Sequence, residues 1–208
     1  MKHLKIKNLN IVFTEKKDGN MREPSNREKL VNKFPIKSLL IPNQKHTANI
    51  IFPENINQEA DGIVIEEKNI AGGVLTADCM PVVLTDFNRL VVIHAGWKGL
   101  LSGIIQKGIE FFEKKENIYA FIGAHARKCC YEVQQDFIEK NGIEKKYIYK
   151  ENNKLTFAMS ELATDILRKY GVKQVEDLSI CTICSDSLFS YRKGNFNERV
   201  LTFAWLEE

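Results

Sequence analysis

Short apolar runs separated by polar turns dominate the first half of the chain. After a segment at 4–13 in which apolar and polar residues alternate, Val, Ile and Leu are concentrated at 38–41, 62–65, 73–76, 81–85 and 90–94. β-Branched residues in runs of this length are typical of strands, and alternation is typical of a half-buried one. We therefore expect these segments to form a sheet.

The pattern then changes to a helical period. Apolar residues recur three and four positions apart between about Trp97 and Lys114, which predicts an amphipathic helix that packs on the sheet. Ser25 and Glu28 have the spacing of a capping box and predict a helix to about Phe34. Further helices are expected at 135–140 and 160–170, strands at 120–122, 178–181 and 199–205, and a hairpin across 152–153.

Strands and helices alternate only partly along this chain. That order favours an α/β (α+β) fold class, with a mixed β-sheet and flanking helices, over a purely parallel sheet. The chain shows no repeat, no low-complexity tract and no linker rich in Pro, Gly or Ser. We therefore expect one domain over residues 1–208. A hydrophobic content of 44% and a charged content of 27% are ordinary for a globular protein.

Charge and cysteine content limit the classes of partner. Lys and Arg total 30 against 27 Asp and Glu, and this net charge of +3 comes without a clustered basic stripe, so no nucleic-acid partner is expected. Residues 1–7 lack the apolar run of a signal peptide, and no segment is apolar enough to cross a membrane. The five cysteines are therefore expected to be reduced thiols in a cytoplasmic protein. The oligomeric state is left open.

Cys79 and His94 are the first candidates for chemistry, because both lie at the ends of predicted strands. They can meet only if the segment 84–90 folds back as a hairpin, which the turn-like residues 86–89 favour. A thiolate with an imidazole suits zinc, or the imidazole can act as the base that activates the thiol. His46 follows another predicted strand and is a third candidate.

The remaining cysteines and two arginines give weaker signals. Cys181 and Cys184, together with Cys129 and Cys130, raise the possibility of a four-thiolate zinc site. The second pair is vicinal and does not have the usual spacing, so we expect all four to be buried small hydrophobic residues. Arg192 and Arg199 flank a turn at Gly194 and are more typical of surface arginines.

The motifs taken together have a specific order. They include Asn26-Arg27, Gln44-x-His46, Ala60-Asp61-Gly62, Thr76-Ala77-Asp78-Cys79-x-Pro81, His94-Ala95-Gly96-Trp97, Tyr131-Glu132-Val133 and Phe189-Ser190-Tyr191-Arg192. Over nearly its whole length the chain resembles the laccase-domain or YfiH-like (DUF152) proteins, formerly called multicopper polyphenol oxidases. The resemblance implies that His46, Cys79 and His94 bind zinc and are catalytic.

The same resemblance suggests residues that bind substrate, and it also has gaps. It places Asn26, Arg27 and Arg192 at the rim of the pocket as substrate-binding candidates. Lys98 stands where the family has Arg, Thr47 where it has Gly, and Gly123-Ala124 where it has Gly-Pro. His125, which follows, is an additional histidine that we expect on the surface or packed in a loop.

The function that the resemblance implies is phosphorolysis of purine nucleosides, such as adenosine, inosine or methylthioadenosine. Phosphate would convert them to a free base and ribose 1-phosphate, with adenosine deamination as a side activity. Three protein ligands leave the fourth position of zinc open, as in catalytic sites. Arg27, in the first turn of its predicted helix, is expected to bind the phosphate.

Three alternatives remain. Copper-dependent phenol oxidation needs many more imidazole ligands than four histidines provide, so copper is expected only as an adventitious replacement for zinc. A cysteine hydrolase, such as an amidase acting on cell-wall precursors, would use Cys79 as nucleophile and His94 as base. A non-catalytic zinc module is disfavoured because structural sites usually have four protein ligands.

Overall fold

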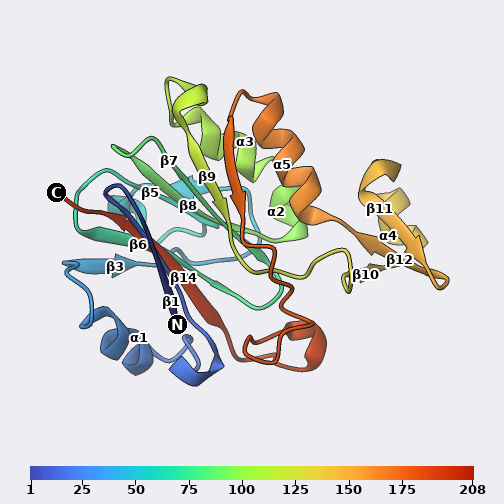
Figure 1. Ribbon diagram of the computed structural model, residues 1–208, viewed down its shortest axis with the longest axis horizontal. Coiled ribbons are helices and arrows are strands. Elements are labelled where there is room, and N and C mark those ends of the chain that lie inside the picture. The colour runs from blue at the N-terminus through green and yellow to red at the C-terminus, as the bar shows by residue number, and fades with distance from the viewer.

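Two stacked sheets form the centre of the computed structural model, which describes residues 1–208 (Figure 1). The five-stranded sheet has the order β1 (Lys2–Ile6), β2 (Leu9–Phe13), β14 (Val200–Leu206), β6 (Ile70–Thr76) and β3 (Ser38–Leu40). The six-stranded sheet has the order β13 (Gln174–Asp177), β9 (Tyr119–Ile122), β7 (Met80–Thr85), β8 (Leu90–Ala95), β5 (Gly62–Ile65) and β4 (Ile50–Ile51). Parallel and antiparallel pairs occur in both sheets.

Helices cover the two outer faces of this pair of sheets. α1 (Pro24–Val31) lies beside the five-stranded sheet, whereas α2 (Trp97–Leu101), α3 (Ile104–Glu110) and α5 (Met159–Lys169) lie on the six-stranded sheet (Figure 1). A small sheet of β10 (Glu132–Val133), β12 (Lys154–Phe157) and β11 (Ile148–Glu151) stands beside α4 (Gln135–Lys140). Short 3-10 helices span 16–18, 53–55, 115–117, 145–147 and 191–193. None of the helices combines the length and the apolar character needed to cross a bilayer.

The two-residue period of the strands explains the layers. In β8, Leu90 and Val92 pack between the two sheets, whereas Val91 and Ile93 pack against the helices on the other face. All four side chains are buried, because a strand between two covered faces has no solvent side. This is why the predicted strands at 62–65, 81–85 and 90–94 are continuous apolar runs.

The predicted mixed α/β fold class is confirmed, and so is the hairpin that the candidate site requires. β7 and β8 pair antiparallel from Met80 opposite Ala95 to Thr85 opposite Leu90. The hairpin at 152–153 is also present, with both asparagines at positive φ. That the whole chain is one domain stays a prediction.

Three details of the sequence prediction are wrong. Residues 4–13 form parts of two antiparallel strands, because the chain turns at Lys7, whose φ is 53°, while the alternating pattern continues across the turn. The strand expected at 178–181 lies instead at 174–177, where it pairs with β9. The helix expected over 97–114 breaks at Gly103, which has a φ of 85°.

The predicted capping box is also wrong. α1 begins at Pro24, Glu23 is the residue before its first turn, and no side chain caps it. Proline favours the first helical position because its φ already suits a helix and its missing N–H has no partner to lose there. The helix ends at Val31, before Phe34.

Candidate active site

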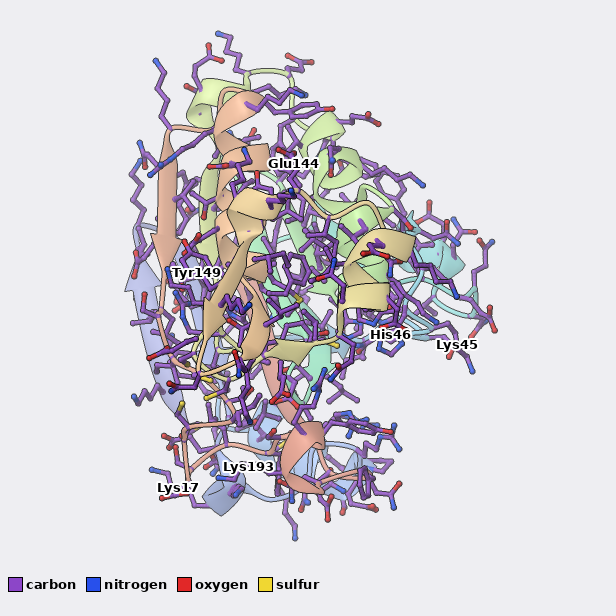
Figure 2. All side chains as sticks on the ribbon, turned by 90° about the vertical axis from the view of Figure 1, so that its right-hand side faces the viewer. Lys17, Lys45, His46, Glu144, Tyr149 and Lys193 are labelled. Carbon is purple, nitrogen blue, oxygen red and sulfur yellow. The ribbon has the colours of Figure 1, made fainter.

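The β7–β8 hairpin brings Cys79 and His94 to the same end of the six-stranded sheet. Pro81 lies opposite His94 in the register, so Cys79, two residues earlier, reaches the same point. The loop after β3 adds His46, whose Nε2 lies 3.8 Å from Cys79 Sγ. Figure 2 shows His46 beside Lys45. The three candidate ligand atoms all lie within 4.8 Å of one another. The structure thus brings together the three residues that the sequence singled out.

A buried carboxylate, Asp61, holds two parts of this cluster in place. One oxygen lies 2.7 Å from His94 Nδ1 and accepts the backbone N–H of His46 at 3.0 Å. The other accepts the backbone N–H groups of Lys45 and Thr47 at 3.1 and 2.6 Å, and the Thr47 hydroxyl at 2.8 Å. Asp61 therefore orients the ring of His94, leaving Nε2 for a ligand, and fixes the loop that carries His46.

Electrostatics in the cluster favour a bound cation. Burial alone would raise the pKa of Asp61, but hydrogen bonds from His94 and Thr47 outweigh it and lower this pKa to about 2. Burial would also raise the pKa of Cys79, but the charge of His94 and hydrogen bonds from both histidines lower it to about 6. Burial lowers the pKa of His94, whereas Cys79 and Asp61 raise it to about 9. The negative charge that favours a proton here also favours a divalent metal ion.

The space between the three ligands depends on a glycine. Gly96 follows β8, and a Cβ atom built there would lie 2.9 Å from His46 Cδ2 and 3.2 Å from Cys79 Sγ. Its φ of −70° is ordinary, so the requirement is for space and not for an unusual backbone. The residues present therefore fit a small ion held by two imidazoles and one thiolate, which are zinc ligands.

The cluster opens into a cavity of about 640 Å³, a size typical of sites for small molecules. Three arginines and three aromatic residues line it, namely Arg22, Arg192, Arg199, Trp97, Tyr131 and Tyr191. Burial, followed by the charge of Arg22, lowers the pKa of Arg199, which indicates that two like charges converge here. Such a convergence favours an anion.

A second buried carboxylate joins the hairpin to the segment before β14. Asp78, the residue before Cys79, accepts the hydroxyls of Thr182 at 2.6 Å and Ser190 at 3.0 Å, and the backbone N–H of Arg192 at 2.8 Å. These bonds hold Arg192 at the cavity, where its guanidinium lies 4.9 Å from the centre of the Tyr131 ring. Asp61 and Asp78 both lie within the motifs quoted above, but no sequence signal assigned a role to either carboxylate.

Two of the predicted substrate-binding residues are not brought to this cavity. The Arg27 guanidinium donates to the backbone oxygens of Met21 and Arg22, at 2.6 and 2.7 Å, and lines a different surface pocket. Asn26 donates to the backbone oxygen of Asn20 at 3.0 Å. Arg192 does line the cavity, as does Arg199, which the sequence suggested was a surface residue.

Two further expectations need correction. His125 is fully buried, so its surface alternative is wrong, and its Nδ1 packs 2.8 Å from the backbone oxygen of Gly123 within a loop. Cys129 and Cys184 are exposed, so the expectation that all four remaining cysteines are buried is wrong. Spacing along the chain is a poor guide to burial when two separate loops meet.

Known proteins are similar to this chain in sequence and in fold. The family model described as multi-copper polyphenol oxidoreductase laccase matches residues 3–207. A protein named purine nucleoside phosphorylase from Aquifex aeolicus is 36% identical to this chain, and the match covers 79% of this chain and 81% of that protein. A protein of the same name from Clostridium acetobutylicum is 31% identical, and the match covers 94% of this chain and 86% of that protein. The crystal structure of a Neisseria meningitidis DUF152 protein, at 24% identity, matches 100% of this chain and 100% of that chain with a TM-score of 0.85. The crystal structure of Bacillus licheniformis YfiH, at 22% identity, matches 96% of this chain and 93% of that chain with a TM-score of 0.84.

The fold and the site together define a class of mixed α/β protein in which a central hairpin carries a cysteine and a histidine at the floor of a cavity. Structural similarity across the whole chain shows the fold of this class. The chain belongs to the family described as multi-copper polyphenol oxidoreductase laccase, because the match extends over almost its entire length. The predicted resemblance to the YfiH-like proteins is thereby confirmed.

The role of Asp61 can be tested by Asp61→Asn, which keeps the size of the side chain and removes its charge. We expect zinc to bind roughly 10- to 100-fold more weakly, because the ring of His94 loses its charged partner. Competition with a chromophoric chelator measures this affinity. Asp186→Asn is the matched control, since the Asp186 side chain is fully exposed. Equal zinc affinity in both variants would show that Asp61 does not position the ligand.

Proposed function

We propose that this protein is a zinc-dependent purine nucleoside phosphorylase, which converts a purine nucleoside and phosphate to the free base and ribose 1-phosphate. The observation that carries the proposal is the convergence, in one cavity, of a zinc-compatible cluster with three arginines and three aromatic side chains. The names of relatives at 36% and 31% identity support the same activity.

In this proposal His46, Cys79 and His94 hold the metal. When bound, zinc would supply a Lewis acid at the floor of the cavity. The histidines provide too few ligands for several copper ions, because only two of the four line the cavity. His3 stacks on Trp205 with its Nε2 2.8 Å from Asn10, and His125 is buried in its loop. Copper would at most replace zinc.

The arginines provide the phosphate subsite in the proposal. The backbone N–H of Arg199 donates to the Asn20 side chain at 2.9 Å, and the backbone carbonyl of Arg199 accepts the N–H of Met21 at 2.9 Å. These two hydrogen bonds bring the exposed Arg22, which follows Met21, beside Arg199. A guanidinium matches two phosphate oxygens with two parallel hydrogen bonds. We therefore assign phosphate binding to Arg22 and Arg199 in place of Arg27, which does not line the cavity and whose guanidinium donates to the backbone oxygens of Met21 and Arg22.

The aromatic residues suit the purine. Trp97 is held edge-to-face against Phe137, with ring centres 5.0 Å apart, and Tyr131 is buried under the guanidinium of Arg192. Burial, followed by the charge of Cys79, raises the pKa of Tyr131 to about 12, so its hydroxyl stays protonated and can donate a hydrogen bond. Flat aromatic faces and a neutral donor are suited to an uncharged heterocycle.

The reaction exchanges one bond at the sugar for another. A phosphate oxygen forms a bond to the anomeric carbon as the bond from that carbon to the base breaks, and the base takes up a proton. In this cavity, arginines would hold the dianion and aromatic rings the base, so positioning supplies a large part of the rate enhancement. Deamination of adenosine in the same cavity would instead need water to attack the purine ring.

One observation favours a second candidate, a cysteine hydrolase. Asp61, His94 and Cys79 are ordered as the orienting acid, the base and the nucleophile of a triad. Zinc would occupy the thiolate and the imidazole that such a hydrolase needs free. Iodoacetamide labelling of zinc-loaded protein separates the two, because rapid modification of Cys79 with zinc still bound would favour the hydrolase.

Product analysis tests the proposed activity directly. Purified protein of measured zinc content, incubated with adenosine or inosine and phosphate, should release the free base and ribose 1-phosphate. Omitting phosphate should abolish this product. If free ribose were formed at the same rate with and without phosphate, the reaction would be hydrolysis and the proposal would be wrong. Inosine formed from adenosine would report deamination separately.

Cys79→Ala tests the metal cluster. We expect this variant to lose one equivalent of zinc per chain and its phosphorolysis, because two imidazoles alone bind zinc weakly. The fold should persist, since Cys79 lies at a strand end and is only half-buried. Elemental analysis measures the zinc, and circular dichroism checks the fold. Unchanged zinc stoichiometry would contradict the assignment.

Arg22→Lys tests the phosphate subsite, because lysine keeps the charge and loses the paired hydrogen bonds. One charge-assisted contact contributes about 1.5–3 kcal/mol, so the KM for phosphate should rise about 10- to 100-fold. Arg168→Lys, on the exposed face of α5, is the control and should keep the wild-type KM. A rise in Arg27→Lys but not in Arg22→Lys would instead favour the residue that the sequence suggested.

A further inference from the structure

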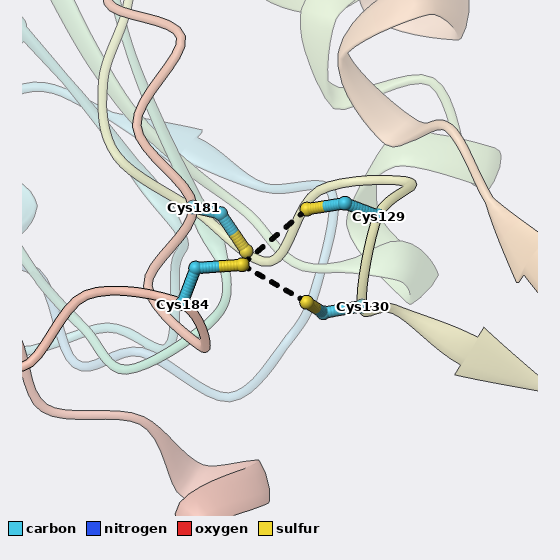
Figure 3. A group of neighbouring side chains, drawn as sticks. All are labelled: Cys129, Cys130, Cys181 and Cys184. Carbon is cyan, nitrogen blue, oxygen red and sulfur yellow. Dashed lines mark hydrogen bonds between the residues drawn. The ribbon is translucent and has the colours of Figure 1, made fainter.

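Four cysteines outside the cavity meet where two loops come together (Figure 3). Cys129 and Cys130 lie between β9 and β10, and Cys181 and Cys184 lie between β13 and β14. Their sulfur atoms all lie within 4.8 Å of one another. Cys184 Sγ is 3.6 Å from Cys129 Sγ and 3.0 Å from Cys130 Sγ, and all four residues are free thiols.

The size and chemistry of this group match a tetrathiolate metal site. A zinc–sulfur bond of about 2.3 Å places sulfurs roughly 3.8 Å apart around a tetrahedral ion. The group is already close to this spacing and consists only of soft sulfur donors, which select zinc over magnesium or calcium. We propose that Cys129, Cys130, Cys181 and Cys184 bind a second zinc ion, distinct from the ion of the cavity. Thiols that bind the ion give up their protons to solvent.

The two loops are held together by contacts that do not involve the sulfurs. The backbone N–H of His125 donates to the Ile180 oxygen at 3.2 Å, and that of Thr182 donates to the His125 oxygen at 3.0 Å. The guanidinium of Arg127 binds both carboxylate oxygens of Asp177 at 2.7 and 2.9 Å. The ligands are therefore positioned before an ion arrives, which lowers the entropic cost of binding it.

Local turns explain how an unusual spacing still provides four ligands. The backbone N–H groups of Cys130 and Tyr131 both donate to the Arg127 oxygen, at 2.9 and 2.8 Å, which curls this loop around its cysteines. On the other loop, Ser185 N–H donates to the Cys181 oxygen at 3.1 Å and closes a turn over the Cys-x-x-Cys segment. Figure 3 shows both vicinal sulfurs directed toward Cys184 and Cys181.

The position of the site indicates what the ion would stabilise. Tyr131, which lines the cavity, directly follows Cys130. Thr182 lies between the other two ligands and donates to Asp78, the residue before Cys79. A site closed by four protein ligands is structural. The second ion would therefore clamp the two loops that form one wall of the cavity, and would not react with substrate.

Elemental analysis of purified protein and its variants tests the site. Wild-type protein should contain two zinc ions per chain, one for each ligand group. Cys184→Ser should contain one, and so should Cys79→Ala, with a different ion lost in each. Ser185→Ala is the matched control on the same turn and should keep two. After replacement of zinc by cobalt, the ion left in Cys79→Ala should show the absorption of an all-thiolate site.

Alkylation of the wild-type protein provides a second test, which holds even if Cys184→Ser does not fold. Cys129 and Cys184 are exposed, so as free thiols they would be accessible to iodoacetamide. We expect peptide mass mapping to find them protected until a chelator removes the metal. Two zinc ions retained by Cys184→Ser, rapid alkylation before chelation, or a disulfide between Cys130 and Cys184 would each overturn the proposal. Neither test depends on nucleoside cleavage.

Discussion

The buried carboxylate of Asp61 is the constraint on which the candidate active site depends. A charge without access to water is stable only if its hydrogen-bond capacity is filled, and here backbone N–H groups, a hydroxyl and an imidazole fill it. Those donors belong to the His46 loop and to His94, which are far apart in sequence. Satisfying one carboxylate therefore brings two ligands to one point and sets the orientation of one ring.

Asp78 repeats the same principle on the other side of the hairpin. Its φ of 83° directs the chain into a tight turn, and its carboxylate is filled by Thr182, Ser190 and the backbone of Arg192. The segment before β14 is thus tied to the residue that precedes Cys79. The cavity is formed where two loop systems each meet a buried carboxylate, and the sheet beneath both provides a rigid floor.

The two cysteine-containing groups differ in the way that separates reactive from structural metal sites. The cavity group has three potential ligands beside a space of about 640 Å³, whereas the loop group has four thiols and leaves no position open. Thr182 links the two groups, because it lies between two of the loop cysteines and donates to Asp78. In the function that we propose, this link would couple the order of the cavity wall to the loop site.

The buried central strands and the β7–β8 hairpin could be predicted from sequence, because continuous apolar runs and a polar turn are local signals. That hairpin also predicted that Cys79 and His94 lie close enough together to bind one metal ion. The vicinal spacing of Cys129 and Cys130 argued against the four-thiol group that the structure forms. The placement of Arg199 at the cavity and of Arg27 outside it could not be predicted. Each depends on which loops meet, and buried hydrogen bonds between residues as far apart as Asp78 and Ser190 decide that only when the whole chain is folded.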